Sequence, residues 1–225
     1  MNIITSFIEY IPFSLNGFRL GFTTFLFGIF LDNSISLQSK NKLIENNSTL
    51  LSKGYEKVFI NLCIISPIFY NILDTYLITH NDLSINYSKY LYLLLIHSIG
   101  YYLGHLAMHK VKIIQPIHKF HHKFTTNLIP SIGNAVSASE FTFAYVSPFL
   151  IGSYLFDPNL QTLNLSIQTI SFFNLIIHCN ELKNLPYNKY FVSPNDHINH
   201  HRLNMEKNTY SAPIINLDTI IKELK

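Results

Sequence analysis

The sequence contains few charged residues. Asp, Glu, Lys and Arg make up 13% of its 225 residues, while hydrophobic residues make up 48%. A typical soluble domain carries about 25% charged residues, so this composition excludes an ordinary soluble domain with a mixed charged surface. The net charge of +3 is small and dispersed, and no zinc-finger, RNP or basic-helix motif accompanies it. We therefore expect no nucleic-acid partner.

Cysteine is also scarce. The chain has two cysteines, Cys63 and Cys179, which are too few for a disulfide framework, and neither belongs to a C-x-x-C pair. Both lie in or beside apolar stretches, where a free cysteine is typically a small buried hydrophobe. A metal site with sulfur ligands is therefore not expected.

Long apolar runs, in contrast, are abundant. Five of them cover residues 13–31, 58–79, 90–108, 141–156 and 160–177. A helix that crosses the bilayer needs about 20 residues, and the first three runs reach that length. The last two are separated only by the turn signal Asp157-Pro158-Asn159, and we interpret them as a short helical hairpin that does not cross fully. Two G-x-x-x-G pairs would allow close helix packing: Gly17 with Gly21, and Gly100 with Gly104.

Lysine and arginine predict the orientation of this membrane domain. Four of the sixteen lie between the first two runs, four follow the third and six follow the fifth, which leaves Arg19 and Lys89. When the chain is threaded with the last two runs as one hairpin, these three segments share a side, and the positive-inside rule makes it cytosolic. We expect a single all-α, multi-pass membrane domain over residues 1–225, with about three spanning helices and the short hairpin. The polar segment 32–57 is predicted to be a cytosolic connecting loop.

Eleven histidines are present, and eight of them fall into three clusters. The clusters are His105 and His109; His118, His121 and His122; and His197, His200 and His201. The last two read H-x-x-H-H, as HKFHH and HINHH, about eighty residues apart. Residues at i, i+3 and i+4 share one face of a helix, so each cluster aims at least two imidazoles at one point. The predicted threading places all three clusters at the cytosolic ends of helices.

Eight converging imidazoles indicate a metal site. Protonated imidazoles would repel one another, whereas neutral ones can surround cations. One tetrahedral ion needs about four ligands, so eight indicate two ions. Imidazole suits Fe, Zn, Cu and Ni, and the scarcity of nearby carboxylates disfavours a carboxylate-bridged di-iron bundle. The competing interpretation, polar packing, suits a single pair better than three clusters of matched spacing.

Five further polar residues lie in or beside the apolar runs. His178 ends the last run on the predicted cytosolic side and is our candidate for a ninth ligand. Asn174 lies one turn earlier, where its amide oxygen would bind metal or cap a neighbour. Glu140 is a candidate to orient a histidine, with a structural ion pair as the alternative. We expect His97 to make a polar contact in the bundle or in a substrate cavity, and His80 to lie in a loop at the opposite interface.

The order of these motifs closely resembles that of the fatty acid hydroxylase/sterol desaturase superfamily. The resemblance covers about residues 90–220 and rests on HLAMH at 105–109, HKFHH at 118–122, His178 and HINHH at 197–201. The segment VSPNDHINHH is similar to the superfamily's S/T-P-x-x-H-x-x-H-H, and KNTYSAPIINLDT is similar to its N-Y-G…W-D tail. Members of this superfamily are integral-membrane, non-haem di-iron oxygenases.

The resemblance implies a catalytic core at residues 90–220 with a histidine-rich metal cap in the cytosol. Two iron ions would be bound by nine ligands, with no catalytic residue beyond them: His105, His109, His118, His121, His122, His178, His197, His200 and His201. Asp196 and Asp218 would orient histidines through hydrogen bonds, or else are solvated loop acids. The implied reaction is O2-dependent hydroxylation or desaturation of a membrane lipid, whether sterol, fatty acyl or ether lipid. A cytochrome b5-like protein or a reductase would supply electrons, and in a eukaryotic cell we expect the endoplasmic reticulum.

Three alternatives stay open. The chain has Leu106 where many members have Arg, has Ser137 and Ala138 where many have His-Pro, and lacks Phe-Gly-Thr after Asp218; these departures fit a catalytically silent, metal-binding homologue. A di-zinc membrane hydrolase would normally use carboxylate ligands, which are few here. The third is a divalent-metal transporter or a metal-storing membrane protein; a transporter places its ligands near the bilayer midplane, whereas these histidines gather at one end.

Overall fold

The described chain is built from helices, and it contains no strand. The computed structural model describes residues 13–80, 84–125, 127–202 and 209–225. The main helices are α2 (Leu15–Asn33), α3 (Leu37–Phe59), α4 (Ser66–Tyr76), α5 (Tyr87–Lys110), α8 (Ser147–Phe156), α9 (Leu160–Ile177), α10 (Pro194–Arg202) and α11 (Leu217–Glu223). Two π-helical segments, η1 (Ile60–Ile65) and η4 (Phe141–Val146), continue into α4 and α8. Short helical turns are α6 (Gln115–His118), η2 (His121–Lys123), η3 (Pro130–Asn134), α7 (Ala138–Glu140) and η5 (Asn180–Leu182). The predicted all-α fold is confirmed.

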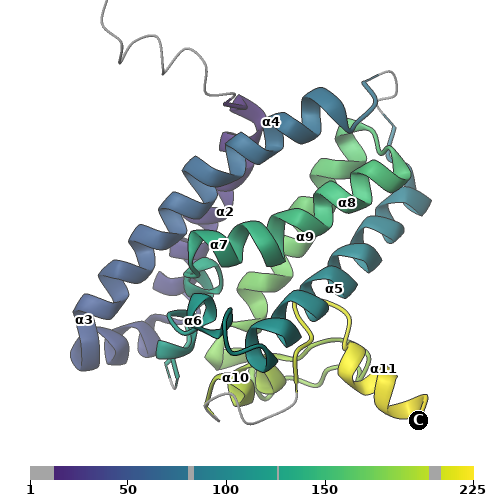
Figure 1. The fold of residues 1–225 in the computed structure, drawn as a ribbon. Coiled ribbons are helices and arrows are strands. Elements are labelled where there is room, and N and C mark those ends of the chain that lie inside the picture. Colours follow the sequence, from purple (N-terminus) through teal and green to yellow (C-terminus); the bar gives the residue numbers. More distant parts are fainter. Residues whose placement is uncertain (1–12, 81–83, 126, 203–208) are drawn as a thin grey trace, which may run out of the picture.

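The long helices form an elongated bundle (Figure 1). Helix α5 packs along α8 and α9, and α2 packs along η1 and α4. Within the described residues, three stretches are long and apolar enough to cross a membrane: Leu37–Tyr76, Tyr87–Lys110 and Leu160–Ile177. This confirms the prediction of about three spanning helices.

The set of spanning candidates differs from the predicted one. Helix α2 is not among them, since it carries Arg19 and Asp32 as well as several Gly and Thr residues. The turn of the predicted hairpin is present: Asp157 has φ 43°, and Asn159 caps α9 by accepting a hydrogen bond from the backbone N–H of Thr162 at 2.9 Å. Helix α9 alone has 18 residues, or about 27 Å, so it can cross by itself, contrary to our expectation for this arm.

The prediction that residues 32–57 form a loop is wrong, because most of this segment belongs to α3. Its apolar residues Leu43, Leu51 and Val58 are buried, while most of its Asn, Lys and Glu side chains are exposed. The helix bends at Asn47, which has φ −163° and ψ 75° and accepts a hydrogen bond from the backbone N–H of Leu50 at 2.9 Å. The amphipathic spacing therefore outweighs the polar composition.

Glycine allows the helices to approach closely, as the two G-x-x-x-G pairs predict. A Cβ atom at Gly21 would lie 1.8 Å from the backbone oxygen of Leu62 in η1, and one at Gly100 would lie 2.8 Å from the ring of Pro148 in α8. The contact at Gly21 is with backbone, which cannot move aside as a flexible side chain can. These positions thus fix how α2 meets η1 and how α5 meets α8.

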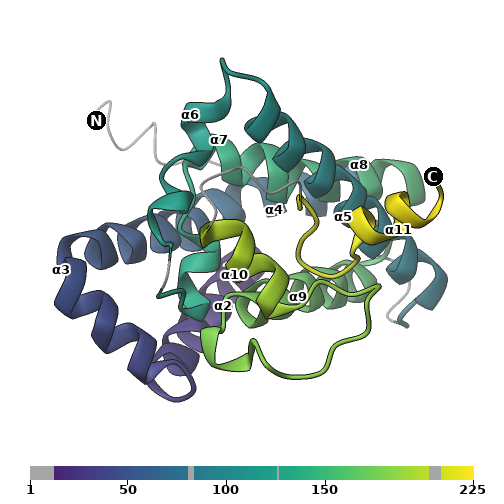
Figure 2. The same ribbon diagram turned by 90° about the horizontal axis from the view of Figure 1, so that it is seen from below.

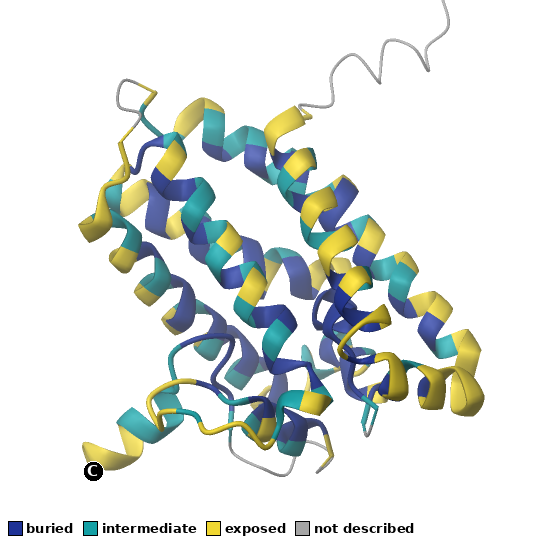
Figure 3. Ribbon diagram, turned by 180° about the vertical axis from the view of Figure 1, so that it is seen from behind, coloured by how far each residue is buried: buried dark blue, intermediate teal, exposed yellow. Residues whose placement is uncertain are grey.

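The outer surface of the bundle differs from that of a soluble protein. Large apolar residues point outward along the bundle, as Phe30, Leu91 and Leu103 do with 61%, 62% and 56% of their surface exposed. Exposed positions recur along the outer faces of the helices (Figure 3), while the histidines of the three clusters are all buried. An outward apolar surface of this kind, together with the three candidate spans, fits a multi-pass membrane protein.

Candidate metal centre

The structure brings all nine predicted ligands together at one end of the bundle. They come from the C-terminal ends of α5 and α9, from the segment of α6 and η2, and from α10, which packs on the end of α9 (Figure 2). They form two groups, and within each group the possible ligand atoms all lie within 4.8 Å of one another. The five-histidine group contains His105, His109, His118, His122 and His200; the four-histidine group contains His121, His178, His197 and His201.

Each H-x-x-H-H segment contributes to both groups. The first and last histidines of HKFHH belong to the five-histidine group, and its middle histidine, His121, belongs to the other. HINHH does the reverse, since its middle histidine, His200, is the one that joins the five-histidine group. Positions one and five of the motif share a helix face, whereas positions four and five point about 100° apart. The motif thus links two sites, and its two copies interlock.

The ring nitrogens are spaced as ligands of shared ions would be. In the five-histidine group the Nε2 atoms of His105 and His118 lie 3.0 Å apart, and in the four-histidine group those of His178 and His197 lie 2.9 Å apart. Two imidazole nitrogens that each lie about 2.1 Å from one ion are about 3.0 Å apart at a right angle and about 3.4 Å apart at the tetrahedral angle. Both groups therefore fit a bound metal ion.

Backbone carbonyl groups fix which nitrogen of several rings faces the centre. The Nδ1 atom of His105 lies 2.9 Å from the carbonyl oxygen of Tyr210, that of His178 lies 2.7 Å from the carbonyl oxygen of Asn174, and that of His201 lies 2.9 Å from that of Phe124. A carbonyl oxygen only accepts, so Nδ1 carries the proton and donates it. In the neutral ring Nε2 then holds a free lone pair, directed at the group's centre.

A carboxyl group, that of Glu140, orients one further ring, that of His118. The Nδ1 atom of His118 lies 2.6 Å from Oε1 of Glu140, and neither side chain is exposed to solvent. Burial raises the pKa of the Glu140 carboxyl well above its ordinary value and lowers the pKa of His118 well below its own. A cation on Nε2 of His118 would oppose the rise and favour the carboxylate. Glu140 thus lies where the sequence expected a group that orients a histidine.

Burial keeps these imidazoles neutral near pH 7. It lowers the pKa of His122 to about 3 and that of His178 to about 4. Burial, followed by the neighbouring histidines, lowers the pKa of His121, His200 and His201 well below the ordinary value. A histidine must be unprotonated to bind metal, so the low pKa values prepare both groups for cations.

The ligand atoms restrict which metal ion the centre can bind. No described cysteine, aspartate or glutamate belongs to either group. Nine imidazoles suit Fe, Zn, Cu and Ni and do not suit Mg or Ca, which prefer oxygen. Each group also has more than the three protein ligands common in catalytic zinc sites.

The other residues singled out in the sequence lie close by in supporting positions. The side chain of Asn174 donates to Oδ1 of Asn134, so it supports His178 through its backbone oxygen and not through its amide. At the start of α10, the helix that carries three ligands, the Ser193 hydroxyl donates to the Asp196 carboxylate and accepts from the backbone N–H of Asp196. Asp218 accepts hydrogen bonds from the backbone N–H of Tyr210 at 2.7 Å and from Ser211. It therefore holds the segment whose carbonyl orients His105.

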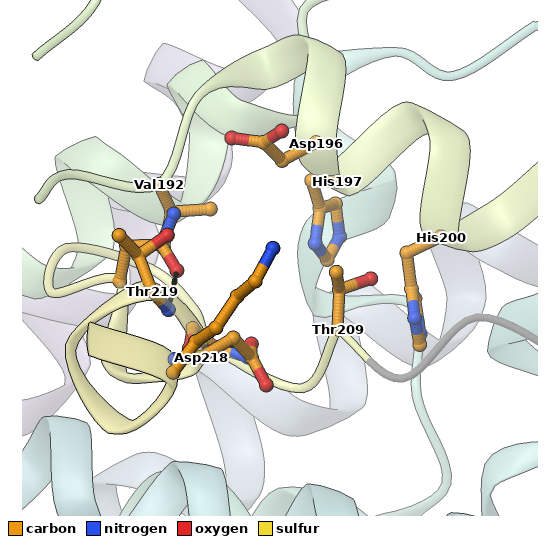
Figure 4. A pocket seen from close by; sticks show the side chains of 10 residues that line it. Val192, Asp196, His197, His200, Thr209, Asp218 and Thr219 are labelled. Carbon is orange, nitrogen blue, oxygen red and sulfur yellow. Dashed lines mark hydrogen bonds between the residues drawn. The ribbon is translucent and has the colours of Figure 1, made fainter. Parts of the chain in front are cut away.

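Two features of the centre had no signal in the sequence. The carbonyl oxygens of Tyr210 and Phe124 orient ligands, but every residue has a carbonyl group and composition does not reveal which one faces a ring. The second feature is a polar cavity of about 310 Å³ on the outer side of the centre. His197 and His200 lie on one side of this cavity, and Val192 and Thr219 lie on the other (Figure 4).

A second, narrower cavity lies inside the bundle. Its volume is about 70 Å³, and most of its lining comes from apolar residues of α2, α4, η4, α8 and α9. Asn134 and Asn174 line it as well, and Asn174 holds His178 through its carbonyl group. The metal centre is therefore flanked by a polar cavity on its outer side and by an apolar cavity on the bundle side.

A comparison with protein-family models matches this chain to the fatty acid hydroxylase family. The match covers residues 90–222, which is more than half of the chain and includes all nine histidines of the two groups. No curated protein and no solved structure matches the chain. The predicted resemblance is confirmed: this protein belongs to the fatty acid hydroxylase family, within the fatty acid hydroxylase/sterol desaturase superfamily of membrane hydroxylases and desaturases.

Proposed function

We propose that this protein is a membrane non-haem di-iron oxygenase that uses O2 to hydroxylate or desaturate a lipid. The observation that carries the proposal is the pair of interlocked, all-imidazole groups beside an apolar cavity of the bundle. The family supports the redox chemistry, and the outward apolar surface supports a substrate that reaches the cavity from the bilayer.

The protein's contribution is to hold and shield the centre. The carbonyl groups of Tyr210 and Asn174 and the carboxyl group of Glu140 keep the Nε2 lone pairs of their histidines directed inward. Fixed geometry removes the reorganisation that free ligands would need during each turnover. The chemistry that two bound iron ions supply is the reductive activation of O2.

We assign a different role to each cavity, one for the lipid and one for protons. The apolar cavity admits the hydrocarbon part of a lipid and excludes water from the C–H bond that reacts. Either outcome consumes two electrons and two protons from outside, because O2 accepts four electrons and the C–H oxidation supplies only two. The polar cavity beside His197 and His200 is the route we assign to protons.

An external electron donor is part of this proposal. A cytochrome b5-like protein or a reductase would approach the histidine end of the bundle. Support comes from the lysines at this end: Lys110 closes α5, and Lys112, Lys119 and Lys123 follow in the next segment. By the positive-inside rule this end faces the cytosol, and in a eukaryotic cell the endoplasmic reticulum is the expected membrane.

The other readings are less well supported. A transporter would hold its ligands near the middle of the bundle, whereas both histidine groups lie at one end. A hydrolase would use a carboxylate as general base, whereas Glu140 is committed to His118, Asp196 to Ser193, and Asp218 to the backbone of Tyr210 and Ser211. A silent homologue would not need the apolar cavity beside the centre.

The test is the iron and zinc content of detergent-purified protein expressed with added iron. His121→Ala and His200→Ala remove one ligand from each group, and His80→Ala is the matched control, because His80 lies exposed outside both groups. We expect about two irons per chain in the wild type and the control, and less in both ligand variants. Lipid screening under O2 with a chemical reductant then identifies the product.

Two results would overturn the assignment. One is protein without iron under these conditions, or iron that both ligand variants retain. The other is two zinc ions accompanied by hydrolysis of an ester or amide, which would move the protein to the hydrolase class. Iron binding without O2-dependent product from any lipid would identify the silent homologue.

A further inference from the structure

We propose that the apolar cavity binds an uncharged lipid through a hydroxyl group, and that His97 is the residue that binds this hydroxyl. The inference rests on the proposed function for the role of the cavity as the path of the lipid. It goes beyond that function by assigning the chemical class of the substrate and a specificity residue outside the metal centre.

The first observation is that His97 is buried without hydrogen bonds. Only 1% of its surface is exposed, and neither Nδ1 nor Nε2 has a hydrogen-bond partner within the described part of the chain. The backbone of Tyr145 lies close enough to interact with the ring, but it does not meet the distance and angle of a hydrogen bond. A buried polar group without a partner is destabilising, and native proteins seldom retain one without a function.

The second observation is where this imidazole points. His97 is the one residue of α5 among those that line the apolar cavity. Its ring packs against that of Phe149, with the centroids 4.7 Å apart. Two other polar side chains of the lining are already bonded: Thr24 to the carbonyl of Leu20, and Tyr145 to that of Gly133. His97 therefore offers free donor and acceptor capacity inside the cavity.

The cavity lining excludes charged ligands. Among the residues that the structure describes, no Lys, Arg, Asp or Glu lines it. A carboxylate or phosphate would lose its hydration there without gaining a counter-ion, which is strongly unfavourable. A neutral imidazole has one donor and one acceptor nitrogen, and an alcohol likewise has one donor hydrogen and acceptor lone pairs. An alcohol is therefore the complement of His97.

The position of His97 also predicts where oxidation occurs. His97 and His105 lie on the same helix, eight residues apart, so they are separated by about 12 Å along its axis. At the end near the ligands, the amide nitrogen of Asn134 also lacks a partner, but it lies beside Asn174 and His178. The hydroxyl thus binds at the remote end, and the oxidised carbon lies several bonds away from it.

The test compares three lipids of equal chain length: 1-hexadecanol, hexadecane and palmitate. Each is mixed with detergent-purified protein, and the lipid that co-elutes in gel filtration is measured by mass spectrometry. We expect the wild type to retain the alcohol about tenfold better than the other two, a preference equivalent to about 1.4 kcal/mol. His97→Phe should abolish the preference, and His97→Gln, which keeps a donor and an acceptor, should keep most of it.

The control is His80→Phe, the same substitution outside the cavity, which should leave the preference unchanged. Equal retention of the three lipids by the wild type, or a preference that survives in His97→Phe, would overturn the proposal. Loss of the preference in His97→Gln as well would assign the effect to ring shape and also overturn it. Retention needs no turnover, and iron is measured in the same samples. An iron-free protein that prefers the alcohol would therefore overturn only the proposed oxygenase function.

Discussion

The two histidine groups differ in what supports them. In the four-histidine group every side chain is at least 97% buried, as His197 is with 3% exposed, and backbone carbonyls orient His178 and His201. In the five-histidine group His109 and His122 are each 8% exposed, and one support is the carboxyl group of Glu140. Backbone carbonyls thus support the four-histidine group, whereas the five-histidine group combines a backbone carbonyl at His105 with a titratable side chain and lies nearer to solvent.

Acidification should have the largest effect of three perturbations of these groups. It acts on both histidine groups and should therefore remove the difference between them. In the metal-free protein the folded pKa of His122 is about 3 and that of His178 is about 4, below the ordinary value near 6.5. The unfolded chain then binds more protons than the folded one as the pH falls below about 6.5. Stability should fall by up to about 1.4 kcal/mol per pH unit for each such histidine.

The measurement is thermal unfolding of chelator-treated protein in detergent at pH 7.5, 6.5 and 5.5. The midpoint should fall between the first two values and about three times further between the second and the third. Iron-loaded protein serves as the control and should show a higher midpoint at pH 7.5 and 6.5, because metal binds the folded state. A midpoint that stays constant to pH 5.5 would contradict the burial of these histidines as neutral groups.

Glu140→Gln should sharpen the comparison by weakening only the five-histidine group. The variant keeps an acceptor for His118 but removes the negative charge, so metal affinity of this group should fall about 10- to 100-fold. The readout is the iron left per chain after dialysis against graded chelator, where one of two ions should leave earlier than in the wild type. Glu45→Gln, the same change at an exposed position, is the control. Simultaneous loss of both ions would show that the groups are not independent.

Gly133→Ala should act on the four-histidine group, with the smallest effect of the three. A Cβ there would lie 2.8 Å from Nδ1 of His178, whereas a Cβ at Gly104 would meet the ring of Phe143 at 3.4 Å, an ordinary contact. Displacing the imidazole should cost about 1 kcal/mol and weaken this site several-fold. Chelator dialysis of Gly133→Ala and Gly104→Ala measures the difference, and equal iron retention in the two variants would count against the tight fit around His178.

Periodicity allowed much of the centre to be predicted from sequence. The spacing of HLAMH and H-x-x-H-H depends on local helix geometry, so the convergence of these histidines could be anticipated. The division into groups could not, because it depends on how α10 packs against α9 and the α6–η2 segment. The same limit applies to Tyr210, whose carbonyl reaches His105 across 105 residues of sequence.

Amino-acid composition led to one wrong prediction and gave no information about a second feature. Asn, Ser and Lys made residues 32–57 look like a loop, but apolar residues at helical spacing let α3 bury one face. For His97 the sequence predicted a polar contact in the bundle or in a cavity. Whether its nitrogens have partners depends on the π-helical turn of η4 and on α8 beside it, which no local pattern encodes.

The interlocked motif has a consequence for how the protein is made. The five-histidine group needs His200, and the four-histidine group needs His197 and His201; all three follow every other member of the two groups in the sequence. Synthesis proceeds from the N-terminus, so neither group is complete until α10 has left the ribosome. The membrane helices that precede it are by then already synthesised. Neither group can therefore take up its ion with a full set of ligands before α10 is made, and an ion bound in one group joins two segments that were made far apart in time.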